Sequence, residues 1–323
     1  MHSTVSSQTN NAVEYDPFVR GRFPVGVRTT EALDTARNRL FPCEIWYPEA
    51  SEGRLPLILY SHHSGGNRRA ATFLCDHLSS HGYVVAALDH SEVIAAELRG
   101  MDGETAEQLS ARVDAWIANR VPDLRFLLDH LLSGKYARVD ADRVGIVGHS
   151  FGGWTALATP EVESRIRAVV ALAPAGSSRP KPGVIPAKLT FRWGRDVPTI
   201  YLVAENDVPL PLDGMSELFE RTPSAKQMVI LRRADHYHFL DNVEEVHETV
   251  RATTFPKDLA WMTAAMRPIA ELCSGEHAHL FVRGLTLCHM DAVLKQRREA
   301  QQFLAGDIEA ELAARGVDVM VHR

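Results

Sequence analysis

Short runs of apolar residues recur along the chain, separated by segments with helical spacing or turn residues. Continuous apolar runs bounded by Gly, Pro or polar clusters are typical of strands, and strands that are apolar on both faces are typical of a buried parallel sheet. Eight such runs predict strands at 23–29, 40–46, 55–60, 83–88, 144–147, 168–173, 199–204 and 227–231. The first two are joined by the polar stretch 30–39.

Helical segments alternate with most of these strands. Phe73, Leu74 and Leu78 lie on one side of a helix predicted over 70–81. Further helices are predicted over 91–119, 121–132, 154–159 and within the tail 274–323, with Pro122 in the first turn of its helix, where proline is tolerated. Strands and helices in alternation predict a three-layer α/β sandwich around a mostly parallel sheet of roughly eight strands.

The pattern divides the chain into a loose arm and one domain. We expect residues 1–20 to form the arm and 21–323 to form a single domain. Within the domain, the Pro-bearing stretch 178–198 predicts an irregular flap, and the tail predicts closing helices that pack on the domain.

Composition narrows the class of protein. The 323 residues are 45% hydrophobic and 24% charged, with a formal net charge of −6, which fits a globular protein with a substantial core. The mild negative charge argues against nucleic acid as a partner. No run approaches the roughly 20 apolar residues that span a bilayer, and the polar N-terminus lacks the apolar segment of a secretory signal, so we expect a cytoplasmic protein without membrane contact.

The four cysteines, Cys43, Cys75, Cys273 and Cys288, form no Cys-x-x-Cys pair, so we interpret them as small core residues. Neither a Gly-x-Gly-x-x-Gly fingerprint nor a P-loop is present, so no nucleotide cofactor is expected. The sequence leaves the oligomeric state open.

The stretch 144–153 carries the strongest chemical signal. An apolar run reaches Gly148-His149-Ser150-Phe151-Gly152 and continues into a helix-compatible segment. A strand that turns sharply into a helix with Ser at the apex is a nucleophile elbow, and small residues two positions away on each side make the strained turn possible. We therefore predict that Ser150 is a nucleophile at the N-terminus of the following helix, where negative charge is favoured.

A serine nucleophile needs a base and an acid that orients the base, and in this kind of fold they follow the serine in the order acid, then His. Asp207 comes just after the strand predicted at 199–204, and we prefer it to Glu205 and Asp213. His236 and His238 both follow the last strand, and we favour His236 because it is nearer the strand end.

The oxyanion of a tetrahedral intermediate needs two backbone donors. We assign one to the N–H of Phe151, directly after the nucleophile, and the other to the N–H of Ser64, in the loop after the strand at 55–60. His63, Tyr60, Trp154 and Trp193 are candidates for lining the substrate pocket, as is Phe191, although aromatic residues more often pack in the core.

A metal site is the less favoured interpretation of the histidines. His62 and His63 are adjacent and would point in opposite directions on a strand, whereas His236 and His238 have a spacing that can chelate. No His-Glu-x-x-His pattern is present, so no metal is expected.

At this point the sequence resembles the α/β-hydrolase superfamily, and within it the dienelactone-hydrolase-like and platelet-activating-factor-acetylhydrolase-like serine esterases. The similarity extends over roughly residues 20–300 and is carried by Cys43–Pro48, Leu57–His62, Val84–His90, Arg120–Leu124 and Gly148–Gly153. It implies a metal-independent hydrolase of small carboxylic esters with Ser150, Asp207 and His236 as its triad. Polyester hydrolases share the general pattern, but nothing in the sequence points to a polymer substrate.

The sequence departs from these relatives in two places. They usually have His-Gly where this chain has His62-His63, so a side chain there could narrow the oxyanion loop or contact substrate. The acidic, Ala-rich segment 91–119 could form a cap. An amidase, a peptidase or an acyltransferase using the same triad, and a non-catalytic binding protein of the same fold, remain alternatives to a carboxylesterase.

Overall fold

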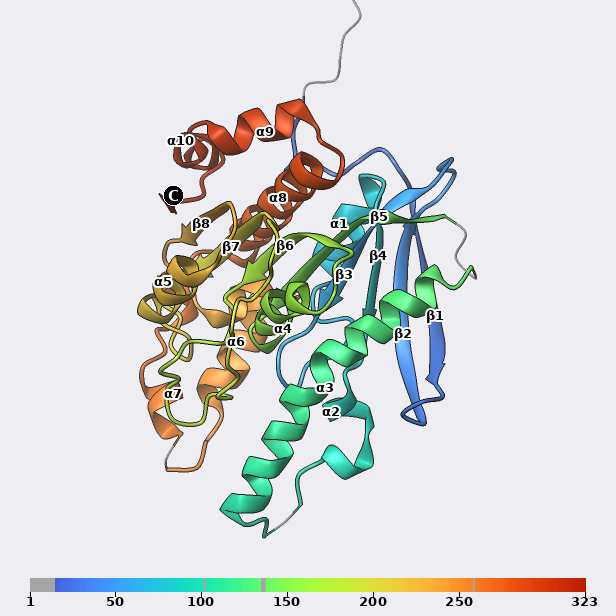
Figure 1. Cartoon of the computed structure of the whole chain (residues 1–323). Helices are drawn as coiled ribbons and strands as arrows, with labels where there is room; N and C mark the ends of the chain where they lie inside the picture. Colours follow the sequence, from blue (N-terminus) through green and yellow to red (C-terminus); the bar gives the residue numbers. More distant parts are fainter. Residues whose placement is uncertain (1–14, 102, 135–137, 258) are drawn as a thin grey trace, which may run out of the picture.

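The computed structural model describes residues 15–101, 103–134, 138–257 and 259–323. Its centre is a nine-stranded sheet in the order β1-β2-β4-β3-β5-β6-β7-β8-β9 (Figure 1). The strands from β4 to β8 in this order pair in parallel, while the pairs β1–β2, β2–β4 and β8–β9 are antiparallel. The bounds are β1 Val25–Asp34, β2 Arg39–Pro48, β3 Leu55–Ser61, β4 Val84–Leu88, β5 Val139–His149, β6 Ile166–Leu172, β7 Thr199–Ala204, β8 Lys226–Leu231 and β9 Val319–His322.

Helices cover both faces of this sheet, as the sequence predicts for a three-layer α/β sandwich. Leu57 and Leu59 of β3 belong to the core shared with α3, α4 and α5, while Ile58 and Tyr60 belong to the core shared with α1, α8 and α10. The alternation arises because successive side chains of a strand point to opposite faces. The helices are α1 Thr72–Ser80, α2 Ser91–Ile94, α3 Ala106–Leu132, α4 Phe151–Ala158, α5 Leu212–Arg221, α6 Val243–Ala252, α7 Ala260–Ala264, α8 Gly275–Leu294, α9 Arg298–Ala305 and α10 Ile308–Ala313. Short 3₁₀ turns are η1 Ala96–Leu98, η2 Thr159–Glu161, η3 His236–Phe239 and η4 Ile269–Glu271.

The first two strands form one long hairpin, and the polar linker predicted at 30–39 shrinks to a tight turn. Asp34 closes the turn, because its Oδ1 accepts hydrogen bonds from the backbone N–H groups of Ala36 and Arg37 at 3.0 and 3.2 Å. Asn38 adopts the left-handed conformation, with φ 49°. Because hydrogen bonds of this kind stabilise a tight turn, the polar residues on either side of it can stay in the two strands. The apolar pattern alone therefore predicts strands that are too short.

The two helices predicted at 91–119 and 121–132 are replaced by α2 and by α3, a single helix that runs through Pro122. Thr105 and Gln108 start α3 with a reciprocal capping box. Pro122 costs the helix one backbone hydrogen bond, and the buried face that follows it, with Leu124, Leu127 and Leu131, compensates by packing on the sheet. The amino-terminal half of α3 extends below the strands in Figure 1.

The C-terminal segment forms helices, as predicted, but ends in a strand that the sequence analysis missed. After α8, α9 and α10, β9 pairs with β8 in antiparallel register, from Leu231 with Val319 to Met228 with His322. Four residues are too short for a periodicity to be recognised. Among the described helices, none combines the length and apolarity that crossing a bilayer requires.

The predicted N-terminal arm is only partly described. Residues 1–14 lie outside the described residues. Phe18, in the same predicted arm, is buried, and its ring lies 5.7 Å from that of Phe303. A Cβ on Gly284 of α8 would lie 2.1 Å from the Phe18 ring, so a glycine in α8 makes room for this side chain.

Candidate active site

Ser150 lies at a sharp bend between β5 and α4. Its backbone has φ 59° and ψ −117°, a conformation that is strained for a residue with a side chain. Its N–H donates to the Leu172 carbonyl at 2.9 Å, and its own carbonyl accepts from the N–H of Ala175 at 2.9 Å. These contacts hold the strained serine in place from the neighbouring strand β6.

The two flanking glycines are required by contact with backbone. A Cβ on Gly148 would lie 2.0 Å from the carbonyl oxygen of Gly152, and a Cβ on Gly152 would lie 2.0 Å from that of Ser61. No larger residue fits at either position without moving a main chain. The bend therefore has the geometry of a nucleophile elbow.

A chain of hydrogen bonds connects the bend to two other loops at the same edge of the sheet. Ser150 Oγ lies 2.9 Å from His236 Nε2, and His236 Nδ1 lies 2.7 Å from Asp207 Oδ2. The other oxygen of Asp207, Oδ1, accepts from the N–H of Leu210 at 2.7 Å. Because the carboxylate accepts, the ring proton of neutral His236 belongs on Nδ1, which leaves Nε2 free to accept the proton of Ser150.

Electrostatics favour this arrangement. Burial alone would lower the pKa of His236, but the negative charge and hydrogen bond of Asp207 outweigh burial and hold that pKa above its ordinary value. An imidazole beside a buried carboxylate is a stronger base than a free one, as general-base chemistry on a serine hydroxyl needs.

The competing candidates have other partners. His238 Nδ1 lies 2.8 Å from Asp235 Oδ1, and its Nε2 lies 3.1 Å from the carbonyl of Cys273, so both ring nitrogens are held away from Ser150. Glu205 accepts from the N–H of Arg233 at 2.9 Å. Asp213 lies in the first turn of α5. The structure brings only Asp207 and His236, among the predicted acids and bases, into the chain that ends at Ser150.

A cavity of about 230 Å³ opens over Ser150 and His236. Both residues predicted to supply oxyanion donors, Ser64 and Phe151, line it. Its other walls come mainly from the loop after β6, the loop after β7, and α7. The remaining lining residues are His63, Ala175, Gly183, Val184, Ile185, Pro209, Leu210, Tyr237 and Met262.

Of the residues predicted to line the pocket, His63 does so, whereas Tyr60, Trp154 and Trp193 lie in the core and do not line it. Trp154 Nε1 donates to the Lys188 carbonyl at 2.9 Å, and Trp193 Nε1 donates to the Leu157 carbonyl at 3.1 Å. The two indoles thus fasten the segment 173–198, all of it described and without helix or strand, onto α4.

That fastened segment supplies the pocket wall. Gly183, Val184 and Ile185 lie within the stretch predicted as an irregular flap, and the proline pattern was the one signal for them. By contrast, no described residue of 91–119, the segment proposed as a cap, lines the cavity. Met262 and Tyr237 had no sequence signal that could distinguish them from core residues.

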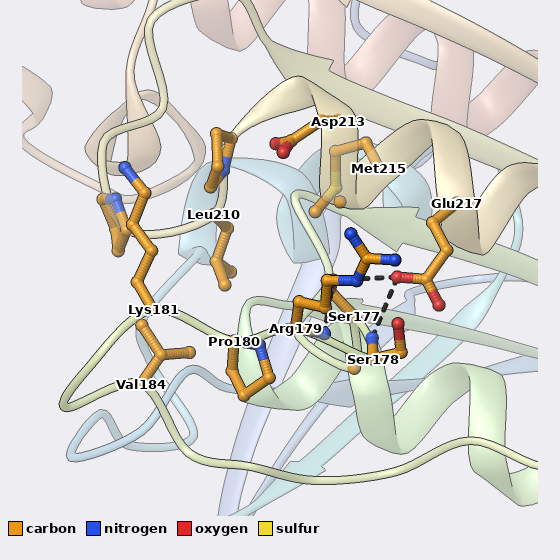
Figure 2. A pocket seen from close by; sticks show the side chains of 14 residues that line it. Ser177, Ser178, Arg179, Pro180, Lys181, Val184, Leu210, Asp213, Met215 and Glu217 are labelled. Carbon is orange, nitrogen blue, oxygen red and sulfur yellow. Dashed lines mark hydrogen bonds between the residues drawn. The ribbon is translucent and has the colours of Figure 1, made fainter.

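A second groove, of about 320 Å³, adjoins the cavity and shares Val184, Pro209 and Leu210 with it. Figure 2 shows Lys181 and Val184 on one side of this groove and Ser177 and Glu217 on the other. Glu217 Oε2 accepts hydrogen bonds from Ser177 Oγ and the N–H of Ser178, both at 2.9 Å. Lys181 Nζ donates to the carbonyl of Val208 at 3.1 Å. The two hollows therefore have Val184, Pro209 and Leu210 as a common wall.

One group of possible metal ligands occurs among the described residues, and it contains none of the histidines of the two predicted pairs. Donor atoms of His90, Glu92 and Asp123 lie within 4.8 Å of one another. Glu92 is ion-paired with the buried Arg120, and Asp123 accepts from both the N–H and the hydroxyl of Ser91. These contacts make the group an internal network in which a guanidinium already provides the positive charge.

Comparison with known proteins identifies the family. Residues 19–266 match the family described as PET hydrolase-like. Cutinase est1 of Thermobifida alba is 26% identical over 181 residues, which are 55% of this chain and 51% of that protein. Platelet-activating factor acetylhydrolase of Cavia porcellus is 26% identical in an alignment of 226 positions that covers 58% of this chain and 49% of that protein. The chain therefore spans about half the length of the curated relatives it matches.

A solved structure shows the same fold. The ferulic acid esterase of Streptomyces cinnamoneus superposes with a TM-score of 0.67 at 22% identity, covering 94% of this chain and 97% of that one. Together with the parallel sheet and the elbow at Ser150, these matches confirm the predicted fold class. The chain belongs to the PET hydrolase-like family of α/β-hydrolases.

Proposed function

We propose that this protein is a serine carboxylesterase, which cleaves a carboxylic ester through an acyl-enzyme. The observation that carries the proposal is the hydrogen-bonded chain from Ser150 through His236 to Asp207, at the bend of a nucleophile elbow and open to a cavity. Relatives whose names include hydrolase, acetylhydrolase and esterase support the ester as the bond that is cleaved.

In the first half of the reaction, Ser150 Oγ attacks the ester carbonyl carbon while His236 Nε2 accepts the hydroxyl proton. Asp207 keeps the imidazole in the required tautomer and stabilises its charged form. The negative charge that develops on the carbonyl oxygen is held by the backbone N–H groups of Phe151 and Ser64. The tetrahedral intermediate then collapses, and His236 returns its proton to the departing alcohol.

In the second half, water takes the place of the alcohol. His236 accepts a proton from this water, which attacks the acyl carbon through a second tetrahedral intermediate, and the acid leaves as Ser150 regains its proton. Val184, Ile185, Leu210 and Met262 make the cavity wall largely apolar, so we expect an apolar group next to the scissile carbonyl. The adjoining groove would take the remainder of a longer substrate.

The test is hydrolysis of p-nitrophenyl acetate and butyrate by the wild-type chain, Ser150→Ala and Ser133→Ala. Ser133 is an exposed serine at the end of α3, so its variant controls for the substitution itself. We expect Ser150→Ala to lower kcat by about 10⁴–10⁶ and to abolish labelling by a fluorophosphonate, while Ser133→Ala behaves as wild type. Activity that survives in Ser150→Ala would contradict the proposal.

Parallel assays with an anilide and a thioester of the same acyl group separate an esterase from an amidase or an acyltransferase. A cytoplasmic location stays a prediction, supported by the four cysteines, which all stand unpaired.

A further inference from the structure

A fully buried arginine lies directly behind the loop that carries Ser64. Arg120, in α3, is one of the largest fully buried side chains of the described residues. One nitrogen, Nη1, donates to the carbonyl of His62 at 2.5 Å, and the other, Nη2, donates to the carbonyl of His63 at 3.2 Å. The proposed triad does not use Arg120, yet a buried guanidinium is costly unless its hydrogen bonds are satisfied.

The carbonyl of His63 belongs to the same peptide group as the N–H of Ser64. All described peptide bonds are trans. In a trans peptide the C=O and the N–H point in opposite directions within one rigid plane. Whatever holds the His63 oxygen toward the interior therefore turns the Ser64 N–H toward the opposite side, where Ser64 and Ser150 line the cavity.

The same oxygen is held by two further donors. The N–H of Gly66 donates to it at 3.1 Å, and His62 Nδ1 lies 2.7 Å away. His62 Nε2 accepts from the N–H of His90 at 3.1 Å, which leaves the ring proton on Nδ1 for the His63 oxygen. Burial and the Arg120 charge keep the pKa of His62 well below its ordinary value, so this ring stays neutral at physiological pH.

Arg120 also contacts the other half of the predicted oxyanion hole. Its guanidinium carbon lies 4.3 Å from the ring centroid of Phe151, whose backbone N–H is the second predicted donor. An arginine placed over an aromatic face is attracted to it, because the face is electron-rich. One side chain thus touches both of the segments whose N–H groups must converge on a single oxyanion.

We infer that Arg120 is the positioning residue of the oxyanion hole: its planar fork fixes the His63–Ser64 peptide and the Phe151 side chain relative to each other. The inference rests on the proposed esterase function. Glu92 supports the fork from behind, because it is ion-paired with Nη2 and is itself buried. Lysine cannot replace this arrangement, since an ammonium is a point charge without the fixed geometry of two parallel donor groups.

The test compares Arg120→Lys with a matched control, Arg195→Lys. Arg195 also donates to backbone carbonyls, those of Ile166 at 2.6 Å and Glu163 at 2.9 Å, but at the opposite edge of the sheet from Ser150. A double variant, Arg120→Met with Glu92→Gln, removes the buried charge pair as a whole, so neither charge is left unpaired. The number of competent sites in each preparation is counted by fluorophosphonate labelling.

For each variant, kcat per labelled site and KM for a p-nitrophenyl ester are measured. The affinity for a trifluoromethyl ketone, which forms an oxyanion at Ser150, and for the product acid are measured in parallel. We expect Arg120→Lys and the double variant to lose about 10²-fold in kcat, the scale of losing one oxyanion donor, with a parallel loss of ketone affinity. KM and product affinity should change little, and Arg195→Lys should keep the wild-type kcat.

The outcomes separate the inference from the function on which it rests. A wild-type chain without Ser150-dependent esterase activity would refute the proposed function. An active wild type whose Arg120 variants keep kcat per labelled site and ketone affinity would refute the role of Arg120 alone. A fall in thermal stability with unchanged kcat per site would likewise show that Arg120 only stabilises the fold.

Discussion

His236 and His238 are two residues apart, and the structure predicts opposite consequences for their replacement by alanine. His236 is hydrogen-bonded to Ser150 and Asp207, whereas His238 is fully buried between Asp235 and the carbonyl of Cys273. We expect His236→Ala to abolish activity and leave the fold intact. We expect His238→Ala to keep activity and lose stability.

The loss of stability expected for His238→Ala follows from the surroundings of the His238 ring. Burial alone would lower its pKa, but the hydrogen bond and negative charge of Asp235, together with the side chain of Cys273, raise the pKa of His238 to about 10. Relative to an ordinary value of about 6.5, and at about 1.4 kcal/mol for each tenfold change in proton affinity, the charged ring is stabilised by about 5 kcal/mol. With an unfolding entropy of about 2.1 cal/mol/K per residue, this corresponds to a Tm about 7 °C lower for His238→Ala.

The pH dependence of this loss has a definite sign. Because the pKa of His238 is raised in the folded state, its contribution is fully present below about pH 6.5 and is lost as the pH rises through about 10. The difference in Tm between the wild type and His238→Ala should therefore be largest at pH 6 and should shrink toward pH 10.

The assay pairs thermal unfolding at pH 6, 8 and 10 with p-nitrophenyl ester hydrolysis at neutral pH. His236→Ala should lower kcat by about 10⁴–10⁶ at an unchanged Tm, while His238→Ala should keep kcat within about tenfold of the wild type. If His238→Ala is inactive at a wild-type Tm while His236→Ala stays active, the assignment of the base is refuted.

Three further predictions follow from the same geometry. Because Asp207 raises the pKa of His236, kcat/KM should fall as the pH drops through a value above about 6.5. Asp207→Asn should move that inflection to lower pH and cut kcat by about 10⁴ in the same pH–rate series. Gly152→Ala would place a Cβ 2.0 Å from the Ser61 carbonyl oxygen. Urea unfolding should therefore show a free energy of unfolding lower by about 1–3 kcal/mol or more, since overpacking a core usually costs this much. Gly100→Ala, whose nearest neighbour is the end of an arginine side chain at 3.4 Å, should be tolerated. Prolonged treatment with EDTA should leave the hydrolysis rate unchanged, since the proposed nucleophile and base are both side chains of the protein. A rate that falls with EDTA and returns with added Zn²⁺ would overturn this expectation.

The elbow could be predicted from the sequence because its cause is local. A strand that turns into a helix around Ser150 requires small residues at 148 and 152, and both glycines lie within the five consecutive residues 148–152. The position of an acid and a base beyond later strands also follows from sequence, because the carboxyl ends of parallel strands meet at one edge of the sheet.

Other features depend on contacts between distant segments. The sequence predicts Trp154 and Trp193 as candidates for lining the pocket. In the structure their indole N–H groups instead donate hydrogen bonds that connect the segment 173–198 with α4. No motif around Arg120 indicates its contacts, and the role proposed for it is inferred only from its distances to His62, His63 and Phe151.

The sequence by itself determined the class of fold, the sharp bend that carries Ser150, and the loops that bring Asp207 and His236 to it. Hydrophobic period, turn chemistry and glycine requirements all act within a few residues, so they can be read along the chain. Only the tertiary structure decided which of two neighbouring histidines faces Ser150, which aromatic residues stay in the core, and that the last four-residue strand joins the sheet. Those outcomes depend on which hydrogen-bond donors and acceptors of distant segments meet in the folded protein. A buried polar group without a partner costs free energy, so the fold that pairs these groups is favoured.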